Sequence, residues 1–239
     1  KLADQNGDSL RMLFMVPSLA LMSQTLQEWS AECQMPFTAW SVCSDTKVNR
    51  KRAERRDLVD IATVDLKTPP TTDPHKLSAS LIEHTYDDGL QVVFATYQSI
   101  DIVHQAQELA GNEWRDFDLI ICDEAHRTTG VTLAGEDESA FTRVHNDAYI
   151  RADKRLYMTA TPRIYQPNVK NTAKEKEAVL TSMDDEETYG PVFHRLGFGA
   201  AVSQGLLTDY KVVVLAVPED QVTPIYQQAA TYGELPIPE

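Results

Sequence analysis

The segment of residues 117–126 reads Phe117-Asp118-Leu119-Ile120-Ile121-Cys122-Asp123-Glu124-Ala125-His126. Its short apolar run, bounded by charged residues, is typical of a strand that is buried on both faces of a parallel sheet. Two adjacent carboxylates follow at the carboxyl end of this strand, which is where open α/β sheets bind their ligands. We therefore expect an α/β fold with a functional site that begins at Asp123.

The two carboxylates suit phosphoryl chemistry. Asp123 can hold Mg²⁺, directly or through a water, because hard cations prefer carboxylate oxygens. Glu124, which strand alternation would place on the other side of the pleat, can orient and deprotonate a water for attack on a phosphoryl group. The alternative is a strand that ends in Asp-Glu by chance, as strands of acidic chains often do.

Other segments repeat a pattern of strand, turn and helix. Residues 11–16 form an apolar run closed by Pro17, and Ser18 is placed to cap a helix that runs to about Trp29. Further strands are predicted over 37–43, 91–96, 154–158 and 210–217, and further helices over 75–86 and from about 100 to 110. The strand over 154–158 ends in Thr159-Ala160-Thr161-Pro162.

The Asp-Glu-Ala-His string, followed a little over thirty residues later by Thr-Ala-Thr-Pro, resembles motifs II (the Walker B box) and III of superfamily 2 helicases and translocases. The resemblance implies a RecA-like parallel sheet flanked by helices, with a helix between the two motifs. It implies that Asp123, Glu124 and His126 are catalytic. Through hydrogen bonds to His126, motif III (Thr159, Ala160, Thr161) would link the state of the γ-phosphate to the grip on DNA.

Two turns resemble the nucleic-acid motifs of the same superfamily. Pro17, Ser18 and Gln24 correspond to motif Ia, where a helix amino terminus can hold a phosphate. Thr96, Gln98 and Ser99 correspond to a Thr-Tyr-Gln-Ser form of motif Ib. Ser18, Gln24, Thr96 and Ser99 are expected to line a surface other than that of the catalytic group. Helix capping explains Ser18 equally well, and the hydroxyls of Thr96 and Ser99 are also able to cap the following helix.

The longer string Asp-Glu-Ala-His-Arg-Thr-Thr-Gly, the later Tyr189-Gly190-Pro191 and the segment 199–217 resemble the ATPase subunits of type I, type III and ISP restriction enzymes. That resemblance implies a first RecA-like domain over 1–195 and the beginning of a second over 196–239. It implies a motor that uses ATP and Mg²⁺ to move on double-stranded DNA. Its further partners would be the rest of the same polypeptide, including a P-loop segment, the remaining second domain and any nuclease, methyltransferase or specificity domain.

The sequence contains no Gly-x-x-x-x-Gly-Lys-Ser/Thr, the loop that cradles the β- and γ-phosphates, and no arginine-finger motif. The order of the motifs fits a chain that begins just after such a loop, with 1–5 as the end of the loop's helix. We therefore expect the isolated polypeptide to be inactive as an ATPase.

Composition restricts the remaining choices. A formal net charge of −14 argues against adhesion to nucleic acid by bulk electrostatics, so any DNA contact must be local. The basic run 47–56 is either a solvated helix face or a strip along a DNA backbone. Cys33, Cys43 and Cys122 are predicted to be buried thiols. The absence of an apolar run near 18 residues and of a signal sequence predicts a cytoplasmic protein.

A functional or mobile loop is predicted from Arg127 to about Ser139, and a charged helix over 170–185.

Two alternative functions are open. One is a degenerate RecA-like module that binds DNA or protein without hydrolysis. The other is a metal-dependent hydrolase with Asp123, Glu124 and His126 as ligands, which strand alternation disfavours because Asp123 and Glu124 would point to opposite faces.

Overall fold

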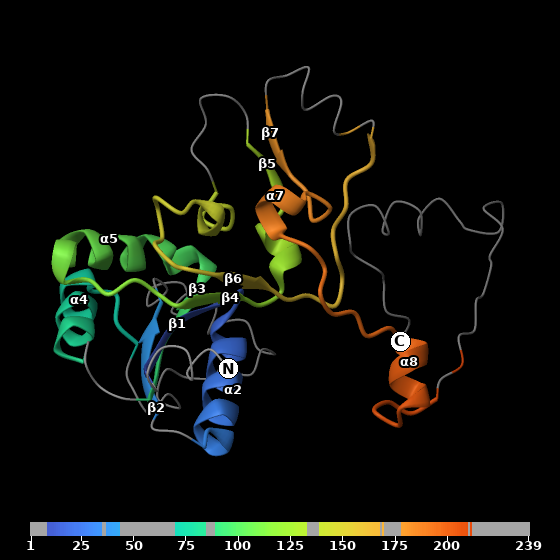
Figure 1. Cartoon of the computed structure of the whole chain (residues 1–239), viewed down its shortest axis with the longest axis horizontal. Coiled ribbons are helices and arrows are strands. Elements are labelled where there is room, and N and C mark those ends of the chain that lie inside the picture. Colours follow the sequence, from blue (N-terminus) through green and yellow to red (C-terminus); the bar gives the residue numbers. More distant parts are fainter. Residues whose placement is uncertain are drawn as a thin grey trace, which may run out of the picture. The chain divides into compact units, whose positions relative to one another are not determined.

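The computed structural model describes residues 9–34, 37–43, 70–84, 89–132, 139–167, 169, 178–209 and 211. Its centre is a five-stranded sheet in which every neighbouring pair is parallel, in the order β2-β3-β1-β4-β6 (Figure 1). The strands are β1 (Ser9–Val16), β2 (Phe37–Val42), β3 (Gly89–Thr96), β4 (Leu119–Cys122) and β6 (Arg155–Tyr157). The predicted α/β class is confirmed, and so are the five strands that were predicted before residue 159.

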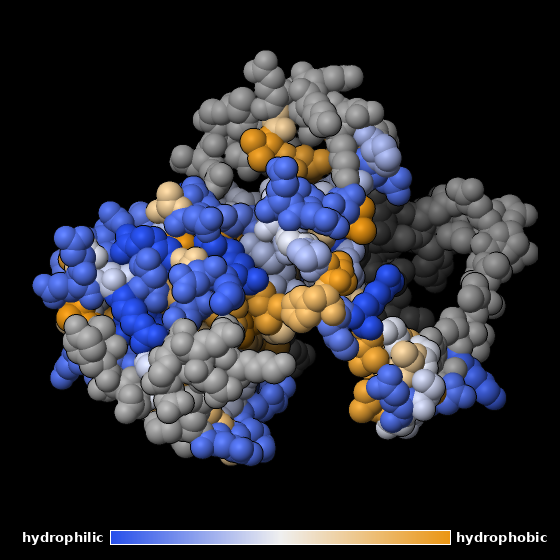
Figure 2. All heavy atoms as spheres, in the orientation of Figure 1, coloured by the Kyte–Doolittle hydropathy of each residue, from blue (hydrophilic) through white to orange (hydrophobic). Residues whose placement is uncertain are grey.

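Helices cover both faces of the sheet, as the apolar strands require. One face packs against α4 (Pro74–Glu83) and α5 (Ile100–Ala110), and the other packs against α2 (Leu19–Glu32) (Figure 1). Along β1, Leu13 and Met15 belong to the first core, whereas Met12 and Phe14 belong to the second. This alternation follows from the two-residue period of a strand. The outward surfaces of α4 and α5 are mainly hydrophilic (Figure 2).

The sequence explains where these helices begin. Ser18 is the N-cap of α2, and its hydroxyl accepts a hydrogen bond from the amide of Leu21. Asp73 caps α4 by accepting from the amide of His75, and a proline occupies the first turn, where its missing amide proton is harmless. A short 3-10 turn, η2 (Tyr97–Ser99), connects β3 directly to α5.

The segment between motifs II and III differs from the expectation. It contains 3-10 turns η4 (Ala125–Thr128) and η5 (Arg143–His145), and no α-helix in its described parts, 126–132 and 139–159. Within the predicted loop, the end of η4 is followed by a strand, β5 (Gly130–Thr132), which pairs antiparallel with β7 (Val179–Thr181). The predicted helix over 170–185 is therefore wrong at 179–181, because pairing with a distant strand overrides a local charge pattern.

By internal contacts the chain divides into two compact units, Lys1–Pro191 and Val192–Glu239. The first ends after α7 (Glu186–Tyr189), where Gly190 takes a positive φ of 70°. The second contains α8 (Phe198–Ser203) among its described residues. Its assignment to a second RecA-like domain remains a prediction. The predicted strand over 210–217, the basic run 47–56 and the helix end at 1–5 lie outside the described residues, apart from Lys211.

The cysteines and the described helices add two observations. The prediction of buried thiols is confirmed for Cys43 and Cys122, whereas Cys33 is half-buried. None of the helices in the described ranges has the length and apolar composition of a membrane span.

Candidate functional site

The site is built where the parallel strands end together. Val16 of β1 is in register with Thr96 of β3, and Cys122 of β4 is in register with Met15 on one side and Tyr157 on the other. The turns that follow these strands therefore meet at one edge of the sheet. This shared edge carries the four turns that resemble motifs Ia, Ib, II and III, which begin after Val16, Thr96, Cys122 and Tyr157.

The Asp-Glu pair lies in a turn and not in the strand. β4 ends at Cys122, and Glu124 has a left-handed backbone with φ 50° and ψ 45°. The assumption that strand alternation separates Asp123 from Glu124 is therefore wrong. Instead, the amide of Glu124 donates to Asp123 Oδ1 at 2.9 Å, which ties the aspartate side chain to the turn.

Neighbouring strand ends hold this turn in place. The amide of Asp123 donates to the carbonyl of Met15 at 2.9 Å, and the amide of Ala125 donates to the carbonyl of Met158 at 2.9 Å. A left-handed conformation costs a residue other than glycine about 1–2 kcal/mol, so it persists only where its surroundings determine it. Such strain is common at functional sites.

His126 connects motif II to motif III. Its Nδ1 lies 3.0 Å from Thr159 Oγ1 and 3.3 Å from Thr161 Oγ1, and the amide of Thr161 donates to Thr159 Oγ1 at 3.1 Å. The same Nδ1 lies 3.1 Å from Glu124 Oε2. The predicted contact between the motif III hydroxyls and His126 is thus present. A neutral imidazole either donates or accepts at Nδ1. When Nδ1 carries the proton, it can donate to the Glu124 carboxylate. When Nδ1 is unprotonated, it can accept from a hydroxyl of motif III.

The electrostatics of Asp123 favour a bound cation. Burial raises the pKa of Asp123, the amide of Glu124 opposes that rise, and the nearby Glu124 carboxylate adds to it. A cation beside Asp123 would stabilise its ionised form. Asp123 Oδ1 is already engaged by the turn, and a single protein carboxylate is the kind of ligand that Mg²⁺ uses when phosphates supply further oxygens. The residues therefore fit Mg²⁺ held between Asp123 and a nucleotide.

The described part of the chain differs from a site in which three side chains hold one metal ion. Within the described ranges, no group of three His, Cys, Asp or Glu side chains is arranged to hold a metal ion. In addition, His126 Nδ1 is directed to Glu124 and to motif III. The hypothesis of a hydrolase with Asp123, Glu124 and His126 as metal ligands is not supported by this arrangement.

The candidate nucleic-acid residues separate into exposed and buried ones. Ser18, Gln24 and Gln98 are exposed, although Ser18 caps α2 and Gln24 donates to Glu28 Oε1 at 3.0 Å. Pro17, which follows β1, is buried.

Thr96 and Ser99 are 6% and 0% exposed, and their hydroxyls bond each other at 2.8 Å. The expectation that they line a surface is wrong for these two residues, because their hydroxyls close the η2 turn internally. Neither hydroxyl caps η2 or α5.

Sequence reasoning missed a buried polar cluster behind motif II. His145 Nε2 lies 3.1 Å from the carbonyl of Thr128, so Nε2 must carry the proton, and Nδ1 accepts from the hydroxyl of Tyr157 at 2.8 Å. The hydroxyl of Tyr189 bonds that of Thr128 at 2.9 Å. The cluster fixes the segment that follows His126.

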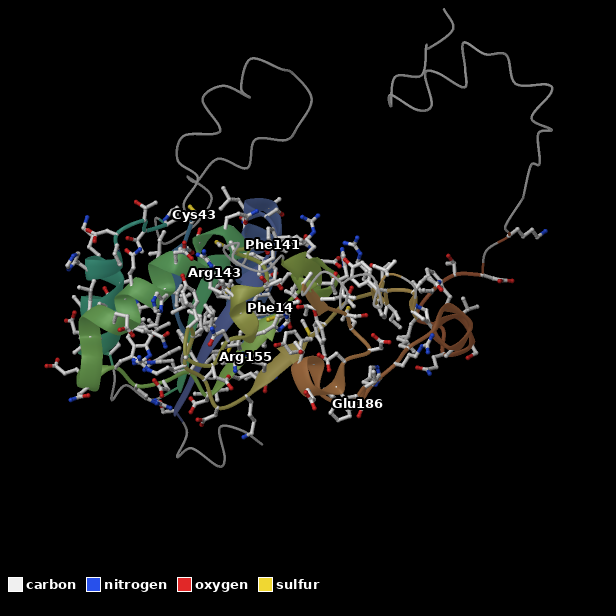
Figure 3. The ribbon with its side chains drawn as sticks, turned by 90° about the horizontal axis from the view of Figure 1, so that it is seen from above. Phe14, Cys43, Phe141, Arg143, Arg155 and Glu186 are labelled. Atoms are coloured by element: carbon white, nitrogen blue, oxygen red, sulfur yellow. The ribbon has the colours of Figure 1, made fainter. Side chains whose placement is uncertain are left out.

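A pocket of about 410 Å³ lies beside this cluster, and Arg155 on its wall is labelled in Figure 3. The conspicuous Tyr189-Gly190-Pro191 was the one signal in the sequence for this region.

Sequence reasoning also missed the contact that Tyr97 makes with motif II. The hydroxyl of Tyr97 donates to the main-chain carbonyl of Asp123 at 2.8 Å, and the side chain is fully buried. The signal was a tyrosine within the polar string Thr96-Tyr97-Gln98-Ser99, where its ring fills the core beneath the turn.

Comparison with known proteins agrees with this geometry. Two solved type ISP restriction-modification enzymes have the same fold as this chain. LlaBIII, bound to DNA, is 38% identical with a TM-score of 0.67 over 98% of this chain. A nuclease-deletion mutant of LlaGI, in complex with a DNA substrate mimic, is 37% identical with a TM-score of 0.63 over 88% of this chain.

A probable helicase of African swine fever virus, A859L, is 26% identical over 210 residues, which is 87% of this chain. The chain spans 15% of each restriction enzyme and 19% of the viral protein.

The RecA-like sheet that the sequence predicted is confirmed by these structures together with the observed strand order. The family model described as "Type III restriction enzyme, res subunit" matches residues 1–164. This chain belongs to the type III restriction enzyme res-subunit family.

Proposed function

We propose that this chain is part of a superfamily 2 motor that couples ATP hydrolysis to movement on double-stranded DNA in a restriction-modification system. The observation that carries the proposal is the His126 side chain, which lies within 3.1 Å of both Glu124 Oε2 and Thr159 Oγ1. This single imidazole joins a candidate hydrolytic carboxylate to a second strand end. Such a connection is what a motor needs, because hydrolysis must be converted into movement of another part of the protein.

In this proposal Mg²⁺ and ATP are the cofactors, and they supply the polarised triphosphate. Asp123 holds the ion, and Glu124 orients the attacking water and accepts its proton. The Glu124 amide holds Asp123 Oδ1 at 2.9 Å and His126 Nδ1 lies 3.1 Å from Glu124 Oε2, so both carboxylates have partners before the nucleotide binds and less reorganisation is needed during the reaction. His126 responds to the charge beside Glu124 by changing its partner between Glu124 and the motif III hydroxyls.

Duplex DNA is the proposed track, contacted at the strand ends by the exposed residues Ser18, Gln24 and Gln98. LlaBIII and LlaGI, each more than a third identical to this chain, were solved with DNA or a DNA mimic, which supports this choice. The remaining partners are proposed to be other parts of the same polypeptide, and the proposed location is the cytoplasm.

The 239 residues alone are proposed to be inactive as an ATPase, since their sequence has no Gly-x-x-x-x-Gly-Lys-Ser/Thr. Phosphate release from this polypeptide with Mg²⁺, ATP and duplex DNA should equal that of its Glu124→Gln variant. Turnover that the substitution abolishes would contradict this part of the proposal.

Movement on DNA is tested with the full-length protein and a DNA triplex placed downstream of its binding site. The wild type should displace the third strand in the presence of ATP, and Glu124→Gln should not, although both bind the DNA. Displacement by Glu124→Gln at the wild-type rate would show that this site does not drive movement. Binding of DNA without ATP turnover in the wild type would instead favour the degenerate binding module.

A further inference from the structure

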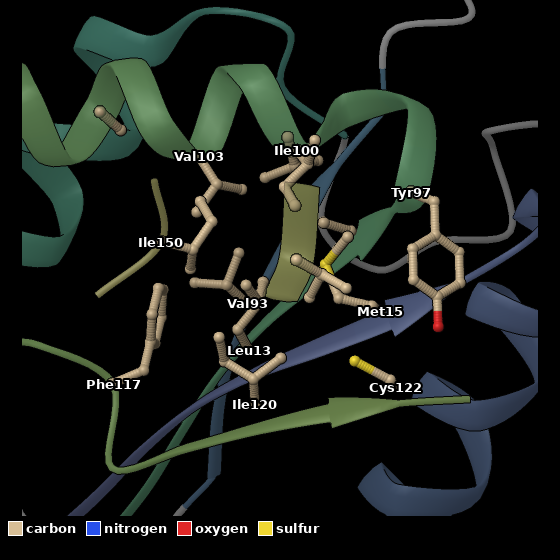
Figure 4. Close-up of a cluster of buried hydrophobic side chains, with 14 of the residues drawn as sticks. Leu13, Met15, Val93, Tyr97, Ile100, Val103, Phe117, Ile120, Cys122 and Ile150 are labelled. Atoms are coloured by element: carbon tan, nitrogen blue, oxygen red, sulfur yellow. The ribbon is translucent and has the colours of Figure 1, made fainter. Parts of the chain in front are cut away.

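Tyr97 reaches the catalytic turn from two strands away. It belongs to η2 after β3, and the sheet places β1 between β3 and β4. Its hydroxyl crosses the end of β1 and donates to the carbonyl of Asp123 at 2.8 Å. Figure 4 shows this hydroxyl directed toward the end of β4. Tyr97 is therefore a link between the motif Ib turn and motif II.

The bond from Tyr97 acts on the peptide unit that controls Glu124. In the peptide between Asp123 and Glu124, the carbonyl oxygen accepts from Tyr97 and the amide donates to Asp123 Oδ1 at 2.9 Å. A planar peptide held at both its oxygen and its nitrogen has a fixed orientation. That orientation sets the unusual φ of 50° at Glu124 and holds the carboxylate of Asp123.

The ring of Tyr97 is itself held firmly. The side chain has no exposed surface, and its ring stacks on Phe141 with centroids 5.2 Å apart. On either side of Tyr97 in the chain, the hydroxyls of Thr96 and Ser99 bond each other at 2.8 Å and close the η2 turn. A displacement of this turn would therefore be carried to the hydroxyl of Tyr97.

Within the same turn, Gln98 is exposed, while Thr96, Tyr97 and Ser99 are buried. The η2 turn thus presents the Gln98 side chain to the surface and directs the Tyr97 hydroxyl to the carbonyl of Asp123. The side-chain amide of Gln98 can donate to a phosphate oxygen, which is a common way for proteins to contact a nucleic-acid backbone.

We propose that Tyr97 is a positioning residue that transmits a DNA contact at Gln98 to the peptide between Asp123 and Glu124. This inference rests on the proposed function, since it assumes that the site hydrolyses ATP when DNA is bound. The contacts of Tyr97 and of the η2 turn are made within the chain itself, so DNA at Gln98 acts by favouring this position of the η2 turn, and Tyr97 thereby raises the fraction of molecules whose catalytic peptide has the strained orientation. Stimulation of hydrolysis by DNA follows from this sequence of contacts.

The test uses the full-length protein with Tyr97→Phe, which keeps the ring and its stacking but removes the donor. The kcat for ATP in the presence of DNA should fall about tenfold, the size expected for one lost hydrogen bond at a reacting centre. The KM for ATP and the Kd for DNA, measured by fluorescence anisotropy, should stay within about twofold. A purely structural role would not produce this difference between kcat and the two binding constants.

Tyr149→Phe is the matched control. The Tyr149 hydroxyl donates to Asp101 Oδ1 at 2.6 Å, away from the catalytic turn, so this variant also loses a tyrosine hydrogen bond. Its kcat should equal that of the wild type. An equal kcat for Tyr97→Phe and Tyr149→Phe would overturn the proposal, whatever their melting temperatures.

Gln98→Ala tests the transmission step. If both residues act through one connection, Tyr97→Phe should reduce DNA stimulation no further when Gln98→Ala is already present. If the double variant instead reduces DNA stimulation by the product of the two single reductions, the two residues act independently and the proposed transmission is wrong. A different result would refute the proposed function itself, and this inference with it. In that result, the wild type shows no DNA-stimulated ATP turnover that is lost in Glu124→Gln.

Discussion

The Nδ1 of His126 lies 3.0 Å from the Oγ1 of Thr159, which joins the turn after β4 to the turn after β6. The Thr159 oxygen also accepts the amide of Thr161 at 3.1 Å, so it organises motif III internally. The Thr159 hydroxyl therefore connects the imidazole of motif II to the backbone of motif III, and the Thr161 hydroxyl lies farther from the same nitrogen, at 3.3 Å.

Thr159→Val should weaken the coupling of hydrolysis to movement in the full-length protein. Valine has the same shape but cannot bond His126, so hydrolysis continues with less effect on motif III. We expect about a fivefold rise in ATP hydrolysed per triplex displaced, equivalent to about 1 kcal/mol of lost coupling. Thr181→Val in β7 is the control and should leave this ratio unchanged. An unchanged ratio for Thr159→Val would exclude the proposed role of motif III.

Glycine at position 124 should stabilise the fold relative to alanine. Glu124 has φ 50°, a conformation that costs L-residues about 1–2 kcal/mol and glycine very little. We expect Glu124→Gly to exceed Glu124→Ala by about 1 kcal/mol in the free energy of unfolding, measured by urea denaturation of this chain. At Glu28 in helix α2, by contrast, the free energy of unfolding of Glu28→Ala should exceed that of Glu28→Gly by about 1 kcal/mol, because glycine is a poor helix former. Equal stabilities at position 124 would mean that the turn relaxes in solution.

Asp123→Asn should increase stability at neutral pH. Burial raises the pKa of Asp123 above its ordinary value of 3.8, so the unfolded chain ionises first as the pH rises. The free energy of unfolding of the wild type therefore decreases as the pH rises from 3.8 to the folded pKa, and the asparagine variant avoids this loss. Urea unfolding at pH 7 should give a higher free energy of unfolding for Asp123→Asn than for the wild type. This difference should shrink toward pH 4.

Asp101→Asn provides the opposite control. Burial of Asp101 alone would raise its pKa, but hydrogen bonds from Tyr149 and Arg143 outweigh that effect and lower it. Asp101→Asn should therefore be less stable than the wild type at pH 7. If both asparagine variants lost stability, the carboxylate of Asp123 would not be a destabilising charge.

The His145 cluster should weaken in mild acid. Burial lowers the pKa of His145 below 6.5, and nearby Arg155 adds to this, while the Thr128 carbonyl and Asp185 oppose it. The stability from neutral His145 is complete above about pH 6.5 and is lost as the pH falls toward the folded pKa, because the unfolded chain takes up the proton first. Between pH 7 and pH 5 the wild type should lose more unfolding free energy than His145→Gln. Parallel pH profiles would contradict this.

Much of the fold could be predicted because its signals are local. Apolar runs of strand length, the cap at Ser18 and the turn after Thr96 each depend on neighbouring residues, and all appear as expected. The strand at 179–181 could not be predicted, since its partner β5 lies about fifty residues away in the sequence. Arg11 is 1% exposed for a similar reason. Its guanidinium donates to Gln91 Oε1 and to the carbonyl of Leu81, which are distant in sequence.

The site was predicted by residue identity more than by geometry. Asp123, His126 and Thr159 occupy one sheet edge because motif spacing and parallel strands place them there. The left-handed turn at Glu124 was missed, since no glycine or asparagine marks it. The contact of Tyr97 with Asp123 was missed because it depends on the sheet order β3-β1-β4, which a single sequence does not specify.

The most direct test is ATP hydrolysis by the full-length protein with and without duplex DNA, comparing the wild type with Glu124→Gln. Glu113→Gln, an exposed change in the 3-10 turn η3 (Gly111–Glu113), serves as the control. We expect DNA-stimulated turnover in the wild type and in Glu113→Gln, and its loss by about a thousandfold in Glu124→Gln with DNA binding retained. Wild-type turnover in Glu124→Gln would contradict the assignment of this turn as the hydrolytic site.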